Sequence, residues 1–144
     1  MTNDSVKPPV WFWIVSGIAL IWNGMGVSAY LMQAYMTAED LAALPEAEQA
    51  LYVDFPAWAT AAFAIAVFAG TLGCLLLLLR KKLAYVVLVL SLVGIIIQMI
   101  YNIFIGKAMD VYGPGAIIMP VMVLAVGLGL IRLAKKATTN GWLN

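Results

Sequence analysis

Long apolar runs separated by short clusters of charge are the main pattern along this 144-residue chain. The first uncharged run extends from Pro8 to Ala38 and opens on the aromatic residues 11–13 (WFW). A membrane-spanning helix needs about 20 mostly apolar residues, and aromatic side chains concentrate where such a helix enters the membrane interface. Four stretches meet this requirement, and they predict spans at about residues 10–35, 57–79, 83–105 and 115–131. We therefore expect an all-α integral membrane protein, an up-down four-helix bundle that forms one domain over residues 1–144.

The polar segment between the first two spans, residues 37–55, carries signals for helix starts. Thr37 followed by Asp40 is the pattern of a capping box, and Pro45 followed by Glu46 is typical of a second helix start. The apolar residues that would form one edge of these helices are Leu41, Leu44, Leu51, Tyr52 and Phe55. This pattern predicts one or two short amphipathic helices over the outer mouth of the bundle. They would serve as a lid or docking surface, or only as a hairpin connection against the membrane interface.

Positive charge is concentrated on one side of the predicted membrane. The cations expected on that side are Lys7, Arg80, Lys81, Lys82, Arg132, Lys135 and Lys136. Lys107 alone is expected on the other side. Because short segments rich in Lys and Arg stay in the cytoplasm, both termini are predicted to be cytoplasmic. The acidic residues that would then lie outside are Glu39, Asp40, Glu46, Glu48, Asp54 and Asp110.

The composition agrees with a membrane protein and excludes several function classes. Hydrophobic residues make up 65% of the chain and charged residues 10%, against roughly 45–50% and 25% in a soluble domain. The mean hydropathy is +1.00, and the net charge of +1 provides no basic field for nucleic acid. The chain has no histidine and a single cysteine, Cys74, which excludes histidine-based catalysis or metal binding and an internal disulfide. We therefore expect no enzyme activity, catalytic residue, cofactor or metal site.

The predicted span interiors hold no Asp, Glu, Lys or Arg, so their polar candidates are amides. Asn23 lies in the first span, whereas Gln98 and Asn102 lie four residues apart on one face of the third. Residues 21–23 (IWN) resemble residues 100–102 (IYN), which suggests that the two helical hairpins form a parallel repeat. Amides donate and accept hydrogen bonds, and aromatic rings stack on apolar faces. The resulting ligand-binding hypothesis comprises Trp22, Asn23, Tyr30, Gln98, Tyr101 and Asn102.

The same amides have a structural interpretation, because Asn and Gln also join helices in membranes by hydrogen bonds. Small residues repeat every four positions along three spans, which predicts close helix packing or, for one of them, a dimer seam. These stripes are Ala62, Ala66, Gly70 and Cys74 in the second span, Gly24 and Ser28 in the first, and Ala125 and Gly129 in the fourth. Pro120 is predicted to kink the fourth helix, because proline removes a backbone hydrogen bond.

Three stretches of the sequence resemble a known group of membrane proteins. They are residues 20–27 (LIWNGMGV), 56–64 (PAWATAAFA) and 70–80 (GTLGCLLLLLR). They look like a family of small bacterial four-helix inner-membrane proteins, largely uncharacterised, whose members are sometimes labelled loosely as sugar transporters. The resemblance implies a location in the bacterial inner membrane and favours a neutral solute. It implies no catalytic residues.

The leading functional hypothesis is a transporter or facilitator for a small neutral polar solute such as a sugar or polyol. The alternative is a non-catalytic accessory or assembly subunit of a larger membrane complex. The expected partners are the lipid bilayer and either a second copy, in a homodimer, or a larger membrane complex. A polar cavity between the first and third spans that contains Asn23 and Asn102 would favour transport. Amides bonded to one another or to backbone would favour the accessory subunit.

Overall fold

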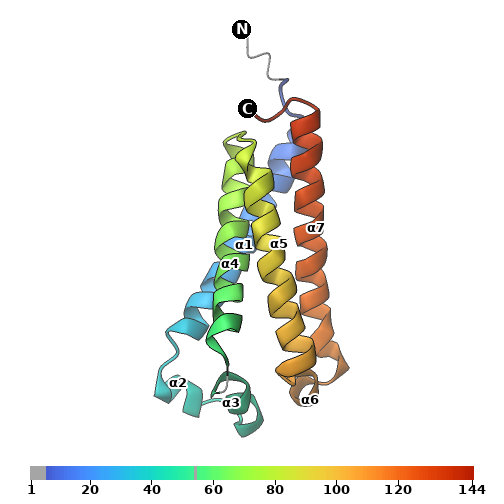
Figure 1. Cartoon of the computed structure of the whole chain (residues 1–144). Helices are drawn as coiled ribbons and strands as arrows, with labels where there is room; N and C mark the ends of the chain where they lie inside the picture. Colours follow the sequence, from blue (N-terminus) through green and yellow to red (C-terminus); the bar gives the residue numbers. More distant parts are fainter. Residues whose placement is uncertain (1–5, 54) are drawn as a thin grey trace.

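The computed structural model describes residues 6–53 and 55–144 and shows an all-helical chain in this part (Figure 1). The long helices are α1 (Val10–Ala34), α4 (Ala57–Leu78), α5 (Leu83–Ile100) and α7 (Ile118–Thr139). A π-helical turn, η1 (Tyr101–Ile105), extends α5, and a 3-10 turn, η2 (Pro114–Ile117), precedes α7. The short helices are α2 (Ala38–Ala42), α3 (Glu46–Val53) and α6 (Ala108–Tyr112). Four helices are long and apolar enough to cross a membrane, so the chain is a multi-pass membrane protein.

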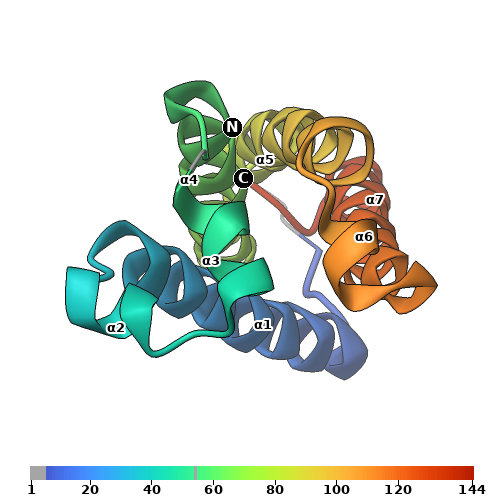
Figure 2. The ribbon, with the colours of Figure 1, turned by 90° about the horizontal axis from the view of Figure 1, so that it is seen from below.

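Consecutive long helices pack side by side, in the order α1, α4, α5 and α7. Figure 1 shows that they alternate in direction, so both termini lie at one end of the bundle, here called the termini end. Helices α2, α3 and α6 lie at the opposite end, here called the loop end (Figure 2). The predicted spans agree with these helices, except that α7 continues past residue 131 to Thr139.

Helix α4 is central because its small side chains let both neighbours approach closely. The four predicted small positions of this helix are all buried: Ala62, Ala66, Gly70 and Cys74. An added Cβ at Gly94 of α5 would lie 2.8 Å from the backbone oxygen of Ala62 and the backbone nitrogen of Ala66. The backbones of α4 and α5 are therefore in direct contact there, which only glycine permits.

The other two predicted stripes do not pack within the chain, contrary to expectation. Gly24 and Ser28 of α1 are exposed, and an added Cβ at Gly24 would meet nothing within 4 Å. Ala125 and Gly129 of α7 are exposed as well. The reason is that α1 packs mainly on α4 and α7 mainly on α5, so one side of each helix faces outward.

The predicted kink at Pro120 is also wrong. Helix α7 begins at Ile118, so Pro120 lies in its first turn. Backbone N–H groups in a first turn have no partner within the helix, and proline therefore removes no hydrogen bond at this position.

The termini end is closed by the C-terminal tail. Gly141, with a φ of 75°, ends α7 in a Schellman motif, in which Trp142 N–H donates to the oxygen of Ala137 over 2.8 Å. This turn sends Trp142 and Leu143 back into the bundle, where both are buried. The Trp142 ring packs edge-on against Trp11 and Phe12, at centroid distances of 5.5 and 5.6 Å. The tail thus fills the space between α1 and α7.

Arg80 fixes this tail to the turn between α4 and α5. It has a left-handed φ of 58°, which is unusual for a residue other than glycine. Its Nε donates to the oxygen of Trp142 over 2.9 Å, and its Nη2 donates to the oxygen of Val6 over 3.1 Å. Two backbone bonds join the same turn to Asn144, through Arg80 O and Lys82 N. The side-chain and backbone bonds together offset the strain of the left-handed turn.

At the loop end, α1 and α7 separate. Near the termini the two helices approach each other, and Lys136 Nζ lies 5.3 Å from the Trp11 ring centroid. From there α1 crosses behind α4 toward α2, whereas α7 runs upright beside α5 (Figure 1). The capping box expected at Thr37 is present and starts α2, since Thr37 and Asp40 exchange two hydrogen bonds of 3.1 Å. Asp40 is exposed, and its pKa is lowered by the hydrogen bond to Thr37.

Candidate functional site

The separation of α1 from α7 leaves a cavity of about 680 Å³ in the loop-end half of the bundle. It is called the inner cavity below. All four long helices, together with α3 and the α6 region, contribute to its wall. Most lining residues are apolar, and none of the described ones is Asp, Glu, Lys or Arg. The polar lining residues are Asn23, Gln33, Tyr52, Gln98, Tyr101, Asn102 and Tyr112. The volume lies in the range of about 300–1,000 Å³ that is usual for small-molecule sites.

Five of the six residues in the ligand-binding hypothesis line this cavity: Trp22, Asn23, Gln98, Tyr101 and Asn102. Tyr30 does not, and it lines a second, smaller cavity instead. The reason is the register of α1. Trp22, Gly26, Ala29 and Gln33 form the stripe that faces the inner cavity, at spacings of four, three and four residues.

Tyr30 belongs to a neighbouring stripe of α1 that faces α4. Its ring packs edge-on against Phe63 and Phe68 of α4, at centroid distances of 5.5 and 5.6 Å. Asn23 lies seven residues earlier, about two helical turns away on the same side of the helix. The direction of both side chains is therefore set by the crossing of α1 over α4.

The Asn23 amide joins α1 to α4. Its Nδ2 donates to the oxygen of Ala19 over 2.9 Å and to Cys74 Sγ over 3.5 Å. An added Cβ at Gly70 would overlap the Asn23 side chain, so the two residues fit closely. Both amide N–H donors of Asn23 therefore have partners within the chain, and its role toward a ligand is limited to its oxygen and to the shape of the cavity wall.

Gln98 and Asn102 differ from Asn23 in this respect. Both side chains are half-buried and line the inner cavity. Neither side-chain amide forms a hydrogen bond to another residue in the described part of the chain. They therefore present two amides, with donors and acceptors, to the interior of the cavity.

The π-helical turn η1 shapes the wall beside these amides. Gly106 N–H donates to the oxygen of Tyr101 over 2.6 Å, five residues back, which closes the wider turn. Tyr101 is buried, with its ring edge-on to Phe55 at 4.8 Å and to Trp58 at 5.4 Å. An added Cβ at Gly106 would lie 2.9 Å from Tyr101 Cε1, so this position leaves no room for a side chain. Single π turns inside α-helices are frequent at functional sites.

Sequence reasoning missed three polar residues of the wall: Gln33, Tyr52 and Tyr112. Gln33 was detectable, because it continues the four-three-four spacing that starts at Trp22. Tyr52 and Tyr112 lie in or beside loops, and only the tertiary structure brings α3 and α6 together at the mouth. Burial raises the pKa of Tyr112, and the negative charge of Glu48 raises it further. A hydrogen bond between the Tyr112 hydroxyl and Glu48 acts in the same direction.

The wall offers hydrogen bonds and apolar surface, and its chemistry fits the binding of an uncharged molecule. Within residues 6–53 and 55–144, no group of three or more His, Cys, Asp or Glu side chains could hold a metal ion. No known family model, curated protein or solved structure matches this chain. The resemblance to small bacterial four-helix inner-membrane proteins therefore stays a prediction.

Proposed function

We propose that this protein is a small transporter or facilitator for a neutral polar solute, such as a sugar or polyol, in the bacterial inner membrane. The charge pattern supports an orientation with both termini in the cytoplasm, because seven of the eight cations belong to the termini end or its turn. The loop end would then face outward. The inner cavity would hold the solute.

The observation that carries this proposal is the pair of cavity-facing amides of Gln98 and Asn102. A polar group left without a hydrogen bond in an apolar environment costs about 1–3 kcal/mol in proteins. A solute with hydroxyl or amide groups would satisfy both side chains. None of the described lining residues is charged, which supports a neutral solute, since an ion would find no counter-charge among them.

The cavity also bears on the expected size of the transport unit. All the residues that line the inner cavity belong to a single chain. A homodimer remains part of the proposal, because the sides of α1 and α7 that carry their stripes of small residues are exposed. Dimerisation would cover these sides without being needed to form the cavity.

Reconstituted vesicles test the proposal. Their osmotic swelling is measured by light scattering with glycerol, D-xylose and D-glucose as probes. We expect the protein to accelerate swelling for at least one probe, and Gln98→Leu or Asn102→Leu to slow it about tenfold, which corresponds to about 1.4 kcal/mol. Asn140→Leu, at an exposed position outside the cavity, is the matched control. Swelling equal to that of protein-free vesicles for all three probes would contradict the proposal.

The bonding of Asn23 favours a second candidate, the accessory subunit of a larger membrane complex. This function predicts embedded amides that bond within the chain, as Asn23 bonds to Ala19 and Cys74. Native mass spectrometry of nanodiscs cut from the source membrane separates the two candidates. A stoichiometric larger complex would support the accessory role, whereas a monomer or dimer that retains a small molecule would support transport.

A further inference from the structure

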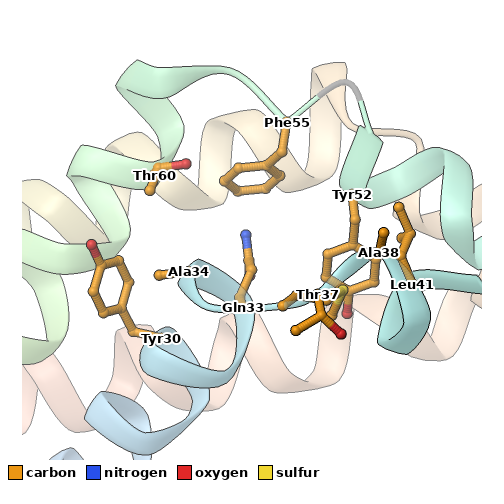
Figure 3. Close-up of a pocket in the computed structure, with 10 residues that line it drawn as sticks. Tyr30, Gln33, Ala34, Thr37, Ala38, Leu41, Tyr52, Phe55 and Thr60 are labelled. Carbon is orange, nitrogen blue, oxygen red and sulfur yellow. The ribbon is translucent and has the colours of Figure 1, made fainter.

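A second cavity, here called the outer chamber, lies beside the inner cavity at the loop end (Figure 3). It has a volume of about 340 Å³ and is bounded by the end of α1, by α2 and α3, and by the start of α4. Its polar lining residues are Tyr30, Gln33, Thr37, Tyr52 and Thr60. Among the described residues, no side chain in the lining is Asp, Glu, Lys or Arg. Five of the ten lining residues thus carry a polar side chain, against seven of the 25 that line the inner cavity.

The polar groups of the outer chamber are held in place by their neighbours. The Tyr30 ring is fixed between Phe63 and Phe68. Thr60 Oγ1 donates to the oxygen of Pro56 over 3.3 Å, which leaves its lone pairs free to accept a hydrogen bond. Figure 3 shows Gln33 extending into the open space, with Tyr30 and Thr60 on one side and Tyr52 on the other.

This set of groups matches a neutral polyhydroxyl molecule. Hydroxyl and amide groups both donate and accept, as the hydroxyls of such a molecule do. The ring of Phe55 adds an apolar face on which the C–H side of a sugar ring can stack. The described lining residues offer no charge to pair with an ionic ligand.

Three residues line both cavities: Gln33, Tyr52 and Phe55. These three residues therefore lie at the border between the two cavities. Phe55 also packs against Tyr101, which lies in the wall of the inner cavity beside Asn102. Rotation of these side chains would therefore change the passage between the two cavities without movement of a long helix.

We propose that the outer chamber is a first binding site for a neutral polyhydroxyl molecule of monosaccharide size, and that Gln33, Tyr52 and Phe55 gate its passage into the inner cavity. This inference rests on the proposed transport function and adds a site and a route to it. The solute would bind at the loop end, pass the gate and then meet Gln98 and Asn102.

Thiol labelling in reconstituted vesicles tests the site. Thr60→Cys is labelled with a charged, membrane-impermeant thiol reagent added from the loop-end side. The wild-type chain, whose single cysteine is buried, is the blank. We expect D-glucose, D-mannitol or myo-inositol to slow labelling at least threefold relative to sodium chloride of equal osmolality. Ala34→Cys, in the same chamber, replaces Thr60→Cys if that variant fails to fold.

The same labelling experiment can also contradict the proposed site. If none of the three polyols slows labelling at either position, the outer chamber is not a polyhydroxyl site. Glu39→Cys, on the exposed surface of α2, marks the side of addition and must label at the same rate with and without polyol.

Met99→Cys tests the gate, because Met99 lines only the inner cavity. We expect the charged reagent to label it about tenfold faster when Phe55→Ala is also present. Phe68→Ala removes another ring that packs on Tyr30 but lines neither cavity, and it should leave the rate unchanged. Ala116→Cys serves as a second reporter in the inner cavity if Met99→Cys is unstable.

An unchanged labelling rate at Met99 with Phe55→Ala would overturn the gate. In that case the inner cavity would still be the proposed solute site, but the solute would enter it by another route. If the wild-type protein does not accelerate vesicle swelling for any probe, the proposed transport function itself is contradicted. The two failures are therefore distinguishable.

Discussion

The same four long helices reach both ends of the bundle, but the two ends differ in what occupies the space between α1 and α7. At the termini end, Phe12 and Leu77 are fully buried, and Trp142 closes the remaining space. At the loop end, the corresponding space is the inner cavity. The termini end is therefore closed by the side chains of the tail after α7, and not by a longer helix. A transporter built this way must open the termini end by moving a side-chain cluster and a short tail.

The largest effect is expected from emptying the closed end. Phe12→Ala removes a fully buried ring and should lower stability by about 3–5 kcal/mol. Phe63→Ala is the matched control, because Phe63 is half-buried and already borders the inner cavity. Its loss should stay below about 2 kcal/mol. Thermal unfolding in detergent measures both, and equal losses would contradict the contrast between the two ends.

A smaller loss is expected from forcing α4 and α5 apart. Gly94→Ala places a methyl group against the backbone of α4 and should cost about 1–3 kcal/mol. Gly24→Ala, where an added Cβ meets nothing, should be neutral or stabilise the helix by up to about 1 kcal/mol. Unfolding in the same detergent checks the pair. A Gly94→Ala variant as stable as wild type would show that the close contact is not required.

Releasing the tail should have a still smaller effect. Arg80→Gly suits the left-handed backbone but removes the bonds to Trp142 and Val6. The gain and the loss oppose each other, and we expect a net loss of about 1 kcal/mol. Hydrogen exchange of the Asn144 amide should become roughly fivefold faster. Protection of that amide at the wild-type level would indicate that Trp142 alone holds the tail.

The smallest effect concerns pH at the open end. The pKa of Tyr112 is higher in the folded chain than its ordinary value. The contribution of Tyr112 to the free energy of unfolding is therefore fully present below the ordinary tyrosine pKa. It is lost as the pH rises through the pKa of Tyr112 in the folded chain. Glu48→Gln removes a negative charge and should lower the pKa of Tyr112 toward its usual range. The tyrosinate absorbance that Tyr112→Phe eliminates reports this titration. A titration unaffected by Glu48→Gln would exclude the charge effect.

Much of the fold was predictable because membrane insertion depends on local composition. The apolar runs located all four long helices, and Thr37 with Asp40 marked the start of α2. The stripe of small residues in α4 correctly indicated close packing, since small side chains are the means by which backbones approach.

The candidate site was predictable only in part, because the direction of a side chain depends on how its helix is rotated and tilted. The amide residues of α5 and η1 were found from their spacing, and they line one cavity. Tyr30 lies outside that cavity and lines the outer chamber instead, since α1 turns its stripe toward α4. The sequence could not show that Asn23 bonds to Cys74, a contact across 51 positions.

The sequence by itself determined the number and position of the spans, the uncharged interior and the supply of embedded amides. Only the tertiary structure decided that α1 and α7 diverge, that the tail closes one end, and that Gln33, Tyr52 and Phe55 separate two cavities. The physical reason is that hydrophobicity and capping act within a few residues along the chain. Cavities and their partitions arise from contacts between distant segments, which no local pattern encodes.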